Sequence, residues 1–159
     1  MSDRPSWDEL FLEMCDVVAK RATCDRKHVG AVLVKDNRVI ATGYNGSIPG
    51  LAHCDDVGHD MEDGHCVRTV HAEVNVICQA AKLGIATDGS TLYCNTLPCW
   101  NCFKTIASSG IRKVVYRDEY RVEEKGRVKD AVEEMDRLTV KEGMNRFFAK
   151  GIQLVRYNG

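Results

Sequence analysis

The chain lacks a surplus of charge of either sign. Its 159 residues contain 22 Lys and Arg against 23 Asp and Glu, which leaves a formal net charge of −1. No basic tail and no stripe of like charge interrupts this balance. Because proteins that bind nucleic acid tightly carry clustered Lys and Arg, the charge distribution argues against a nucleic-acid partner and favours a small molecule.

Long apolar runs are also missing. No segment approaches the ~18 consecutive apolar residues that a membrane-spanning helix needs. The N-terminal residues Met1 to Pro5 lack the apolar stretch of a signal peptide. We therefore expect no membrane association and a cytoplasmic location. With no internal repeat or low-complexity segment, the length suits one domain over residues 1–159.

Cysteine, in contrast, is plentiful, with eight residues. Disulfides are rare in the reducing cytoplasm, so these residues are interpreted as metal ligands and buried thiols. Cys15, Cys78 and Cys94 fall on expected helix or strand faces, and we interpret them as small core residues.

Two separate motifs carry the chemistry: His71-Ala72-Glu73 and Pro98-Cys99-Trp100-Asn101-Cys102. One His and two Cys supply three zinc ligands and leave the fourth tetrahedral position for water, as in catalytic sites. Glu73 is a spare carboxylate two residues from a ligand, where it can act as a general acid and base. The alternative is a structural zinc knuckle, but such a site normally closes with a fourth Cys or His.

The hydrophobic pattern predicts a mixed α/β fold. Helices are expected over residues 7–22, 70–83, 98–109 and 128–150, and strands over 29–35, 38–45, 91–95, 113–116 and 152–157. Asp36-Asn37 is a two-residue hairpin signal between the first two strands. The long helical connection before the last strand allows the fourth and fifth strands to run parallel. We expect a mixed five-stranded sheet with helices on both faces.

The two motifs together form the His-x-Glu and Pro-Cys-x-x-Cys signature of zinc-dependent nucleobase deaminases. Further matching segments are Val29-Gly-Ala-Val32, Gly43-Tyr-Asn-Gly46, the loop from Cys54 to Cys66, His65 to Glu73, and Ser109 to Tyr116. From about Trp7 to Tyr120, the chain resembles the deoxycytidylate (dCMP) deaminases of the cytidine deaminase superfamily, close to their late-competence deaminase-like branch.

The resemblance implies a cytidine-deaminase-like three-layer α/β/α sandwich. It implies zinc-dependent hydrolysis of dCMP to dUMP with release of ammonia, which supplies dUMP for thymidylate synthesis. It also implies a homo-oligomer, often a hexamer, with dCTP and dTTP as possible effectors. In the family, a regulatory nucleotide binds near the positions of Lys82 and the Gly43 to Gly50 turn.

The resemblance also assigns roles to single residues. For the catalytic centre, it implies that His71, Cys99 and Cys102 are the zinc ligands and that Glu73 is the proton shuttle. For the nucleoside, it implies that Asn45 contacts the deoxyribose and that the backbone amide of Ala72 contacts the pyrimidine O2. It further implies that Arg26 contacts the 5′-phosphate and that Tyr120 is an aromatic that closes over the base or phosphate. For Arg26 the alternative is a solvated loop charge, and for Tyr120 an ordinary aromatic at a strand end.

A second zinc site is suggested by the long segment from residue 46 to 68, which has no helical or strand periodicity. Cys24, Cys54, His59, His65 and Cys66 offer five ligands, and four of them close a tetrahedral structural zinc that can order this loop. Some family members carry a structural zinc here. We favour Cys24, Cys54, His59 and His65, with Cys66 as the alternative to His65. Otherwise these residues are reduced thiols and surface histidines.

Three other functions remain open. An editing deaminase that acts on a base in RNA or DNA uses the same zinc chemistry, although the charge balance argues against it. A deaminase of free nucleosides is a second alternative, disfavoured by the large ligand-rich loop. A non-catalytic zinc-bound assembly protein is a third, and the intact His71-Ala72-Glu73 motif argues against it.

Overall fold

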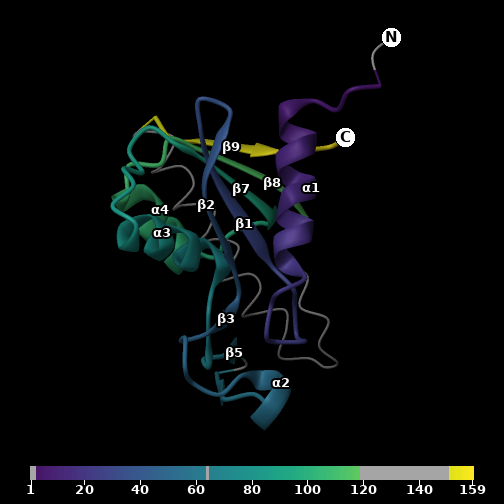
Figure 1. The fold of residues 1–159 in the computed structure, drawn as a ribbon, viewed down its shortest axis with the longest axis vertical. Coiled ribbons are helices and arrows are strands. Elements are labelled where there is room, and N and C mark those ends of the chain that lie inside the picture. Colours follow the sequence, from purple (N-terminus) through teal and green to yellow (C-terminus); the bar gives the residue numbers. More distant parts are fainter. Residues whose placement is uncertain (1–2, 64, 119–150) are drawn as a thin grey trace.

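A mixed five-stranded sheet forms the centre of the protein (Figure 1). The computed structural model describes residues 3–63, 65–118 and 151–159. The sheet order is β2-β1-β7-β8-β9, built from β1 (Gly30–Lys35), β2 (Arg38–Tyr44), β7 (Thr91–Thr96), β8 (Lys113–Asp118) and β9 (Gln153–Arg156). β1 pairs antiparallel with β2 and β7, whereas β7, β8 and β9 run parallel to one another. The predicted parallel pairing of the fourth and fifth strands is therefore confirmed.

Helices cover both faces of this sheet, as expected. Helix α1 (Trp7–Ala19) packs on one face, and helices α3 (Ala72–Lys82) and α4 (Trp100–Ser108) lie on the other (Figure 1). Each face has its own buried apolar cluster. Residues of β7 alternate between the two clusters: Leu92 and Cys94 belong to the α3 and α4 side, and Tyr93 belongs to the α1 side. The result is the three-layer α/β/α sandwich.

The hairpin between β1 and β2 follows the sequence signal. Asp36 and Asn37 both have positive φ, 50° and 55°. A two-residue hairpin of this kind requires positive φ at both positions, which Asp and Asn tolerate better than most residues. The pairs Lys35 with Arg38 and Gly30 with Tyr44 set the ends of the register.

The helices that carry the metal motifs start slightly later than the periodicity predicted. α3 begins at Ala72 because His71 is extended, with φ −64° and ψ 149°, and acts as the N-cap. α4 begins at Trp100 because Cys99 is extended in the same way. α1 ends at Ala19. From Lys20 to Ala22, each backbone N–H donates to the carbonyl three residues earlier, so the chain continues in tight turns. The helix predicted over 128–150 lies outside the described residues.

The segment without periodicity folds into a small lobe below the sheet (Figure 1). It contains β3 (Gly46–Ser47) paired with β6 (Thr69–Val70), the single-turn helix α2 (Cys54–Val57), and β4 (Met61–Glu62) paired with β5 (His65–Cys66). These elements are two to four residues long, too short to show a period in the sequence. In the described ranges, no helix combines the length and the apolar character that crossing a membrane requires.

Gly43 makes the close contact between β2 and α3 possible. A Cβ at this position would lie 2.5 Å from the Val76 amide nitrogen and 2.6 Å from the Ala72 carbonyl oxygen. Both atoms belong to the helix backbone, so Gly43→Ala must push α3 away from the sheet. We expect a loss of about 3 kcal/mol in the free energy of unfolding, measured by denaturant titration.

Gly46→Ala is the matched control for Gly43→Ala. A Cβ there meets the ring of Tyr44 at 3.1 Å, and a side chain can move aside more easily than a helix backbone. We expect it to cost less than half as much stability as Gly43→Ala. Equal losses for the two variants would contradict the close packing of α3 on β2.

Candidate active site

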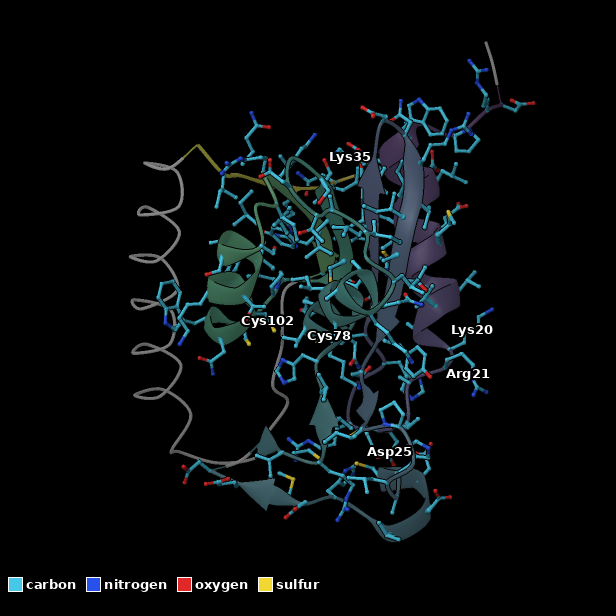
Figure 2. The ribbon with its side chains drawn as sticks, turned by 60° about the vertical axis from the view of Figure 1, so that its left-hand side comes forward. Lys20, Arg21, Asp25, Lys35, Cys78 and Cys102 are labelled. Carbon is cyan, nitrogen blue, oxygen red and sulfur yellow. The ribbon has the colours of Figure 1, made fainter. Side chains whose placement is uncertain are left out.

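Two helix N-termini bring the metal motifs together on one side of the sheet. His71 is the N-cap of α3, Cys99 is the N-cap of α4, and Cys102 lies in the first turn of α4. Figure 2 shows Cys102 on the face of α4 that is turned toward the interior. The positive ends of both helix dipoles therefore point at the same place and favour anionic sulfur there.

The geometry of these three side chains fits a zinc ion. His71 Nδ1 lies 3.6 Å from Cys99 Sγ and 3.4 Å from Cys102 Sγ. A tetrahedral ion with Zn–S of ~2.3 Å and Zn–N of ~2.0 Å requires nitrogen-to-sulfur separations of ~3.5 Å. All three ligand atoms lie within 4.8 Å of one another. His71, Cys99 and Cys102 thus form a group able to hold zinc, with one tetrahedral position left over.

The charges at this group also favour a divalent cation. Contacts with Cys102 and His71 lower the pKa of the Cys99 thiol to about 4. Contact with Cys99, together with burial, raises the pKa of Cys102. The lowered pKa of Cys99 favours negative charge on its sulfur, which attracts a cation, and zinc would be bound by both sulfurs as thiolates.

Glu73 lies directly beside the three ligands in the first turn of α3. Its side chain is only 5 % exposed, and burial raises the pKa of its carboxyl. Two thiols contact the carboxylate: Cys102 Sγ is 3.6 Å from Oε2, and Cys94 Sγ is 3.7 Å from Oε1. A buried carboxyl with a raised pKa holds a proton more readily than an exposed one, which suits a group that takes up and releases protons beside a metal.

Asn45 and Ala72, the two predicted contacts of the base and sugar, lie at the end of β2 and at the start of α3. Ala72 is fully buried as the first residue of α3, where backbone N–H groups have no partner within the helix. Asn45 follows β2, and its side chain holds the loop before β1: Oδ1 accepts from Val29 N at 2.8 Å, and Nδ2 donates to Lys27 O at 2.7 Å. The structure thus shows Asn45 as an anchor of this loop.

The two predicted phosphate contacts are not brought together by the described residues. The guanidinium of Arg26 reaches toward the lobe, where Nη1 lies 3.3 Å from Met61 Sδ. Tyr120 lies outside the described residues.

Lys27, next to Arg26, is half-buried. Burial lowers the pKa of its ammonium, and the negative charges of Asp118 and Glu73 nearby oppose that change. A cation of this loop therefore lies within electrostatic reach of Glu73.

The second predicted metal group assembles in the lobe. Cys24, Cys54, His59 and Cys66 offer ligand atoms that all lie within 4.8 Å of one another. Cys24 Sγ is 3.5 Å from His59 Nδ1, and Cys54 Sγ is 3.5 Å from Cys66 Sγ. Tetrahedral zinc requires about 3.5 Å for the first separation and about 3.8 Å for the second. Four ligands complete the tetrahedron, as in structural zinc sites.

A carboxylate orients the histidine of this group. His59 Nε2 lies 2.9 Å from Asp25 Oδ1, so the ring donates its Nε2 proton to Asp25 and turns the lone pair of Nδ1 toward Cys24. Figure 2 shows Asp25 at the lobe end of the molecule. An imidazole held between a carboxylate and a metal is a common arrangement in zinc proteins.

The fourth member of the lobe group is Cys66, the alternative to the favoured His65. Both belong to β5, where Cys66 pairs with Met61 and His65 pairs with Glu62. The thiol of Cys66 lies 3.5 Å from Cys54 Sγ and within ligand distance of Cys24 and His59. The side chain of His65 is not among those that the structure describes.

Several positioning residues could not be recognised from the sequence. Asn75 Nδ2 donates to the carbonyls of Tyr44, at 2.8 Å, and Val70, at 3.3 Å, and so fixes the chain just before His71. Asn95 is buried in β7, where Oδ1 accepts from Gly30 N at 3.1 Å. Asn95 Nδ2 also donates to the carbonyl of His28 at 3.3 Å. Neither residue belongs to a motif, and only tertiary contacts reveal its role.

The thiols outside the two metal groups differ in their surroundings. Cys15 is fully buried, as predicted. Cys78 is exposed on α3, so its interpretation as a core residue is wrong (Figure 2). Cys94 is fully buried, but it contacts Glu73 as well as apolar neighbours.

Comparison with known proteins places these features in a family. Residues 5–118 match the cytidine and deoxycytidylate deaminase zinc-binding region. That range contains both metal groups and Glu73. The chain belongs to the cytidine and deoxycytidylate deaminase family.

Two relatives align with about three quarters of this chain. ComE operon protein 2 of Bacillus subtilis is 47% identical over 119 residues, which cover 75% of this chain and 63% of that protein. Deoxycytidylate deaminase of Schizosaccharomyces pombe is 38% identical over 131 residues, which cover 76% of this chain and 39% of that protein. The chain thus spans less than two thirds of the length of either relative.

A solved structure shares the fold along nearly the whole chain. The crystal structure of dCMP deaminase from the cyanophage S-TIM5 in complex with dCMP and dUMP superposes with a TM-score of 0.73. Its sequence is 29% identical, and the match covers 98% of this chain and 100% of that chain. The cytidine-deaminase-like fold predicted from the sequence is confirmed.

Proposed function

We propose that this protein catalyses the zinc-dependent hydrolytic deamination of dCMP to dUMP, with release of ammonia. The observation that carries the proposal is the convergence of His71, Cys99 and Cys102 at zinc-ligand distances, with the Glu73 carboxylate buried beside them. Relatives named deoxycytidylate deaminase and the fold shared with a dCMP-bound deaminase support this substrate.

The residues of the site divide the chemistry between them. A zinc ion held by His71, Cys99 and Cys102 would supply a water of lowered pKa, the nucleophile for C4 of the cytosine ring. Glu73 would take one proton from this water and deliver it to ring nitrogen N3. The proton of the hydroxyl group then on C4 would pass through the same carboxylate to the amine, and the C4–N bond would break as ammonia leaves. The burial of Glu73 keeps bulk water from competing for these protons.

Substrate recognition uses the two segments that border the metal. We assign the pyrimidine O2 to the Ala72 N–H at the start of α3 and the deoxyribose to Asn45, whose side chain also anchors the loop at Lys27 and Val29. We assign the 5′-phosphate to cations of that loop, Arg26 and Lys27, and to Tyr120. The positive charge of the loop then distinguishes a nucleotide from a nucleoside.

The lobe group is proposed as a second, structural zinc site, with Cys24, Cys54, His59 and Cys66 as ligands. The lobe has little apolar core of its own, since α2, β4 and β5 are two to four residues long. Metal binding free energy therefore takes the place of apolar burial in ordering it. Cys24 also ties the lobe to the loop that carries Arg26 and Lys27.

The contact between Asp25 and His59 allows a selective test of the lobe site. Asp25→Asn keeps the shape of the side chain but removes the charge that orients the imidazole. We expect affinity for the lobe zinc to fall about 10–100-fold in chelator competition, with the catalytic zinc unchanged. Asp56→Asn, a change at an exposed residue of α2, is the control and should leave both affinities unaltered. Equal affinities for Asp25→Asn and wild type would contradict the role of Asp25.

The cellular role follows from the reaction. We propose a single deaminase domain over residues 1–159 that works in the cytoplasm and supplies dUMP for thymidylate synthesis. A homo-oligomer such as a hexamer, and control by dCTP and dTTP, remain predictions from the family. Lys82, suggested as a regulatory contact, is the exposed last residue of α3.

Ammonia release from a panel of substrates tests the function. Zinc-loaded protein is incubated in parallel with dCMP, deoxycytidine, CMP, dCTP and a cytosine-containing single-stranded oligonucleotide, with and without dCTP as an activator. We expect turnover of dCMP and at least 100-fold lower kcat/KM for deoxycytidine, because a nucleoside lacks the 5′-phosphate that such a site binds.

Other outcomes of this panel point to the other functions. Turnover of the oligonucleotide alone indicates an editing deaminase, and turnover of deoxycytidine alone indicates a nucleoside deaminase. No turnover of any substrate by zinc-loaded protein would refute the catalytic proposal and favour a zinc-bound assembly protein.

A further inference from the structure

Cys94 occupies the layer between the central strand and the two metal-bearing helices. It lies on β7, paired with Ala31 of β1 and Tyr116 of β8. Side chains alternate along β7, so Cys94 shares its face with Leu92 and belongs to the cluster under α3 and α4. Its exposed fraction is 0 %. A residue there sits directly beneath the first turn of α3, which carries Glu73.

The thiol of Cys94 contacts the carboxylate that the proposed reaction needs. Its Sγ donates toward Glu73 Oε1 at 3.7 Å. The other carboxylate oxygen, Oε2, is contacted by Cys102 Sγ at 3.6 Å. Each oxygen of Glu73 thus has its own sulfur contact, and all three residues are buried.

The two thiols differ in their relation to the metal group. Cys102 is one of the three residues able to hold zinc, and a sulfur that binds zinc has no proton to donate. Cys94 belongs to neither metal group, so its S–H stays available to Oε1. Oε2 lies on the side of Cys102, a member of the metal group.

We propose that Cys94 is a positioning residue: its S–H holds one oxygen of the Glu73 carboxylate so that the other faces the metal-bound side of the site. This inference rests on the proposed deaminase function. Cys94 belongs to neither metal group, and in this proposal it acts only through Glu73. The sequence suggested no more than a small core residue at this position, because the contact exists only when β7 and α3 are packed together.

Three substitutions at Cys94 separate hydrogen bonding from packing. Cys94→Ala removes the donor and leaves a small cavity, Cys94→Val removes the donor but fills the space, and Cys94→Ser keeps a donor. We expect kcat for dCMP to fall about tenfold in both the Ala and Val variants, with KM within twofold of wild type. The Ser variant should retain at least half of the wild-type kcat. Zinc content should equal that of wild type in all three.

Cys15→Ala is the matched control for loss of a buried thiol. Cys15 is also fully buried, but it belongs to the cluster on the α1 face of the sheet and lies away from Glu73. It should lower thermal stability about as much as Cys94→Ala and leave kcat unchanged. Wild-type kcat in Cys94→Val would overturn the proposal, since space filling alone would then suffice. A Ser variant as slow as the Ala variant would overturn it too.

A spectroscopic readout tests the contact without relying on turnover. The S–H stretching band of Cys94 is identified by infrared difference between wild type and Cys94→Ala. We expect it at the lower frequency of a hydrogen-bonded thiol, and we expect Glu73→Ala to shift it to the position of a free thiol. An unshifted band contradicts the proposal. If wild-type protein turns over no nucleotide but this shift is present, the proposed function fails while the Cys94 contact stands.

Discussion

Glu73→Gln is expected to reduce turnover of dCMP by about 10²–10⁴-fold while zinc stays bound at the wild-type stoichiometry. Glutamine has the shape of glutamate but cannot take a proton from water and pass it to N3 and the leaving amine. Glu73 is not one of the three residues proposed to bind zinc, His71, Cys99 and Cys102, so the metal should be retained. Steady-state ammonia release and metal analysis on the same preparation measure both quantities.

The stability of this variant separates lost chemistry from lost folding. Burial raises the pKa of the Glu73 carboxyl, so the folded state disfavours its ionised form. Above the unfolded-state pKa, ionised Glu73 therefore lowers the stability of the metal-free protein, and the neutral amide removes that cost. We expect metal-free Glu73→Gln to unfold at or above the wild-type temperature at pH 7.

Glu13→Gln, on the exposed side of α1, is the matched control and should match wild type in activity. More than a tenth of wild-type turnover in Glu73→Gln would contradict the assignment of Glu73 as the proton carrier.

The second large effect concerns the lobe. Cys66→Ser should lower the zinc content from two ions per chain to one and lower the thermal unfolding temperature by about 10 °C or more. Cys66 closes a four-ligand group with Cys24, Cys54 and His59, and its Sγ lies 3.5 Å from that of Cys54. Loss of one thiolate opens the tetrahedron, and the short elements α2, β4 and β5 have little apolar core to replace the metal.

His65→Ala is the matched control for Cys66→Ser, because His65 is the neighbouring residue of β5. It should keep two zinc ions and an unfolding temperature close to that of wild type. The reverse pattern, in which His65→Ala loses an ion and Cys66→Ser keeps both, would restore the ligand set favoured by the sequence. Wild-type protein with one zinc ion per chain would contradict the lobe site altogether.

The elements that show a clear period in the sequence were the predictable ones. Apolar residues at helical spacing marked α1 and α3, and Asp36-Asn37 marked the turn of a hairpin whose positive φ angles suit these two residues. The predicted starts of α3 and α4 were two residues too early. His71 and Cys99 are extended N-caps, and only the backbone angles reveal this.

The catalytic group was predictable from the sequence because its residue types and spacing restrict the chemistry. His71, Cys99 and Cys102 do lie at ligand distances from one another. In the lobe, the choice between His65 and Cys66 depends on which strand position faces Cys24, and two-residue strands leave no trace of that in the sequence. The contact of Cys94 with Glu73 depends on strand alternation across the sheet, so it too required the tertiary structure.

The most direct test of hydrolytic deamination is to follow the oxygen of water. Zinc-loaded protein is incubated with dCMP in ¹⁸O-labelled water, and the product is analysed by mass spectrometry. The account predicts dUMP with one labelled oxygen, at C4, formed by wild type and at least 100-fold more slowly by Glu73→Gln. Absence of dUMP, or dUMP without the label, would contradict the proposal that this site directs water onto the cytosine ring.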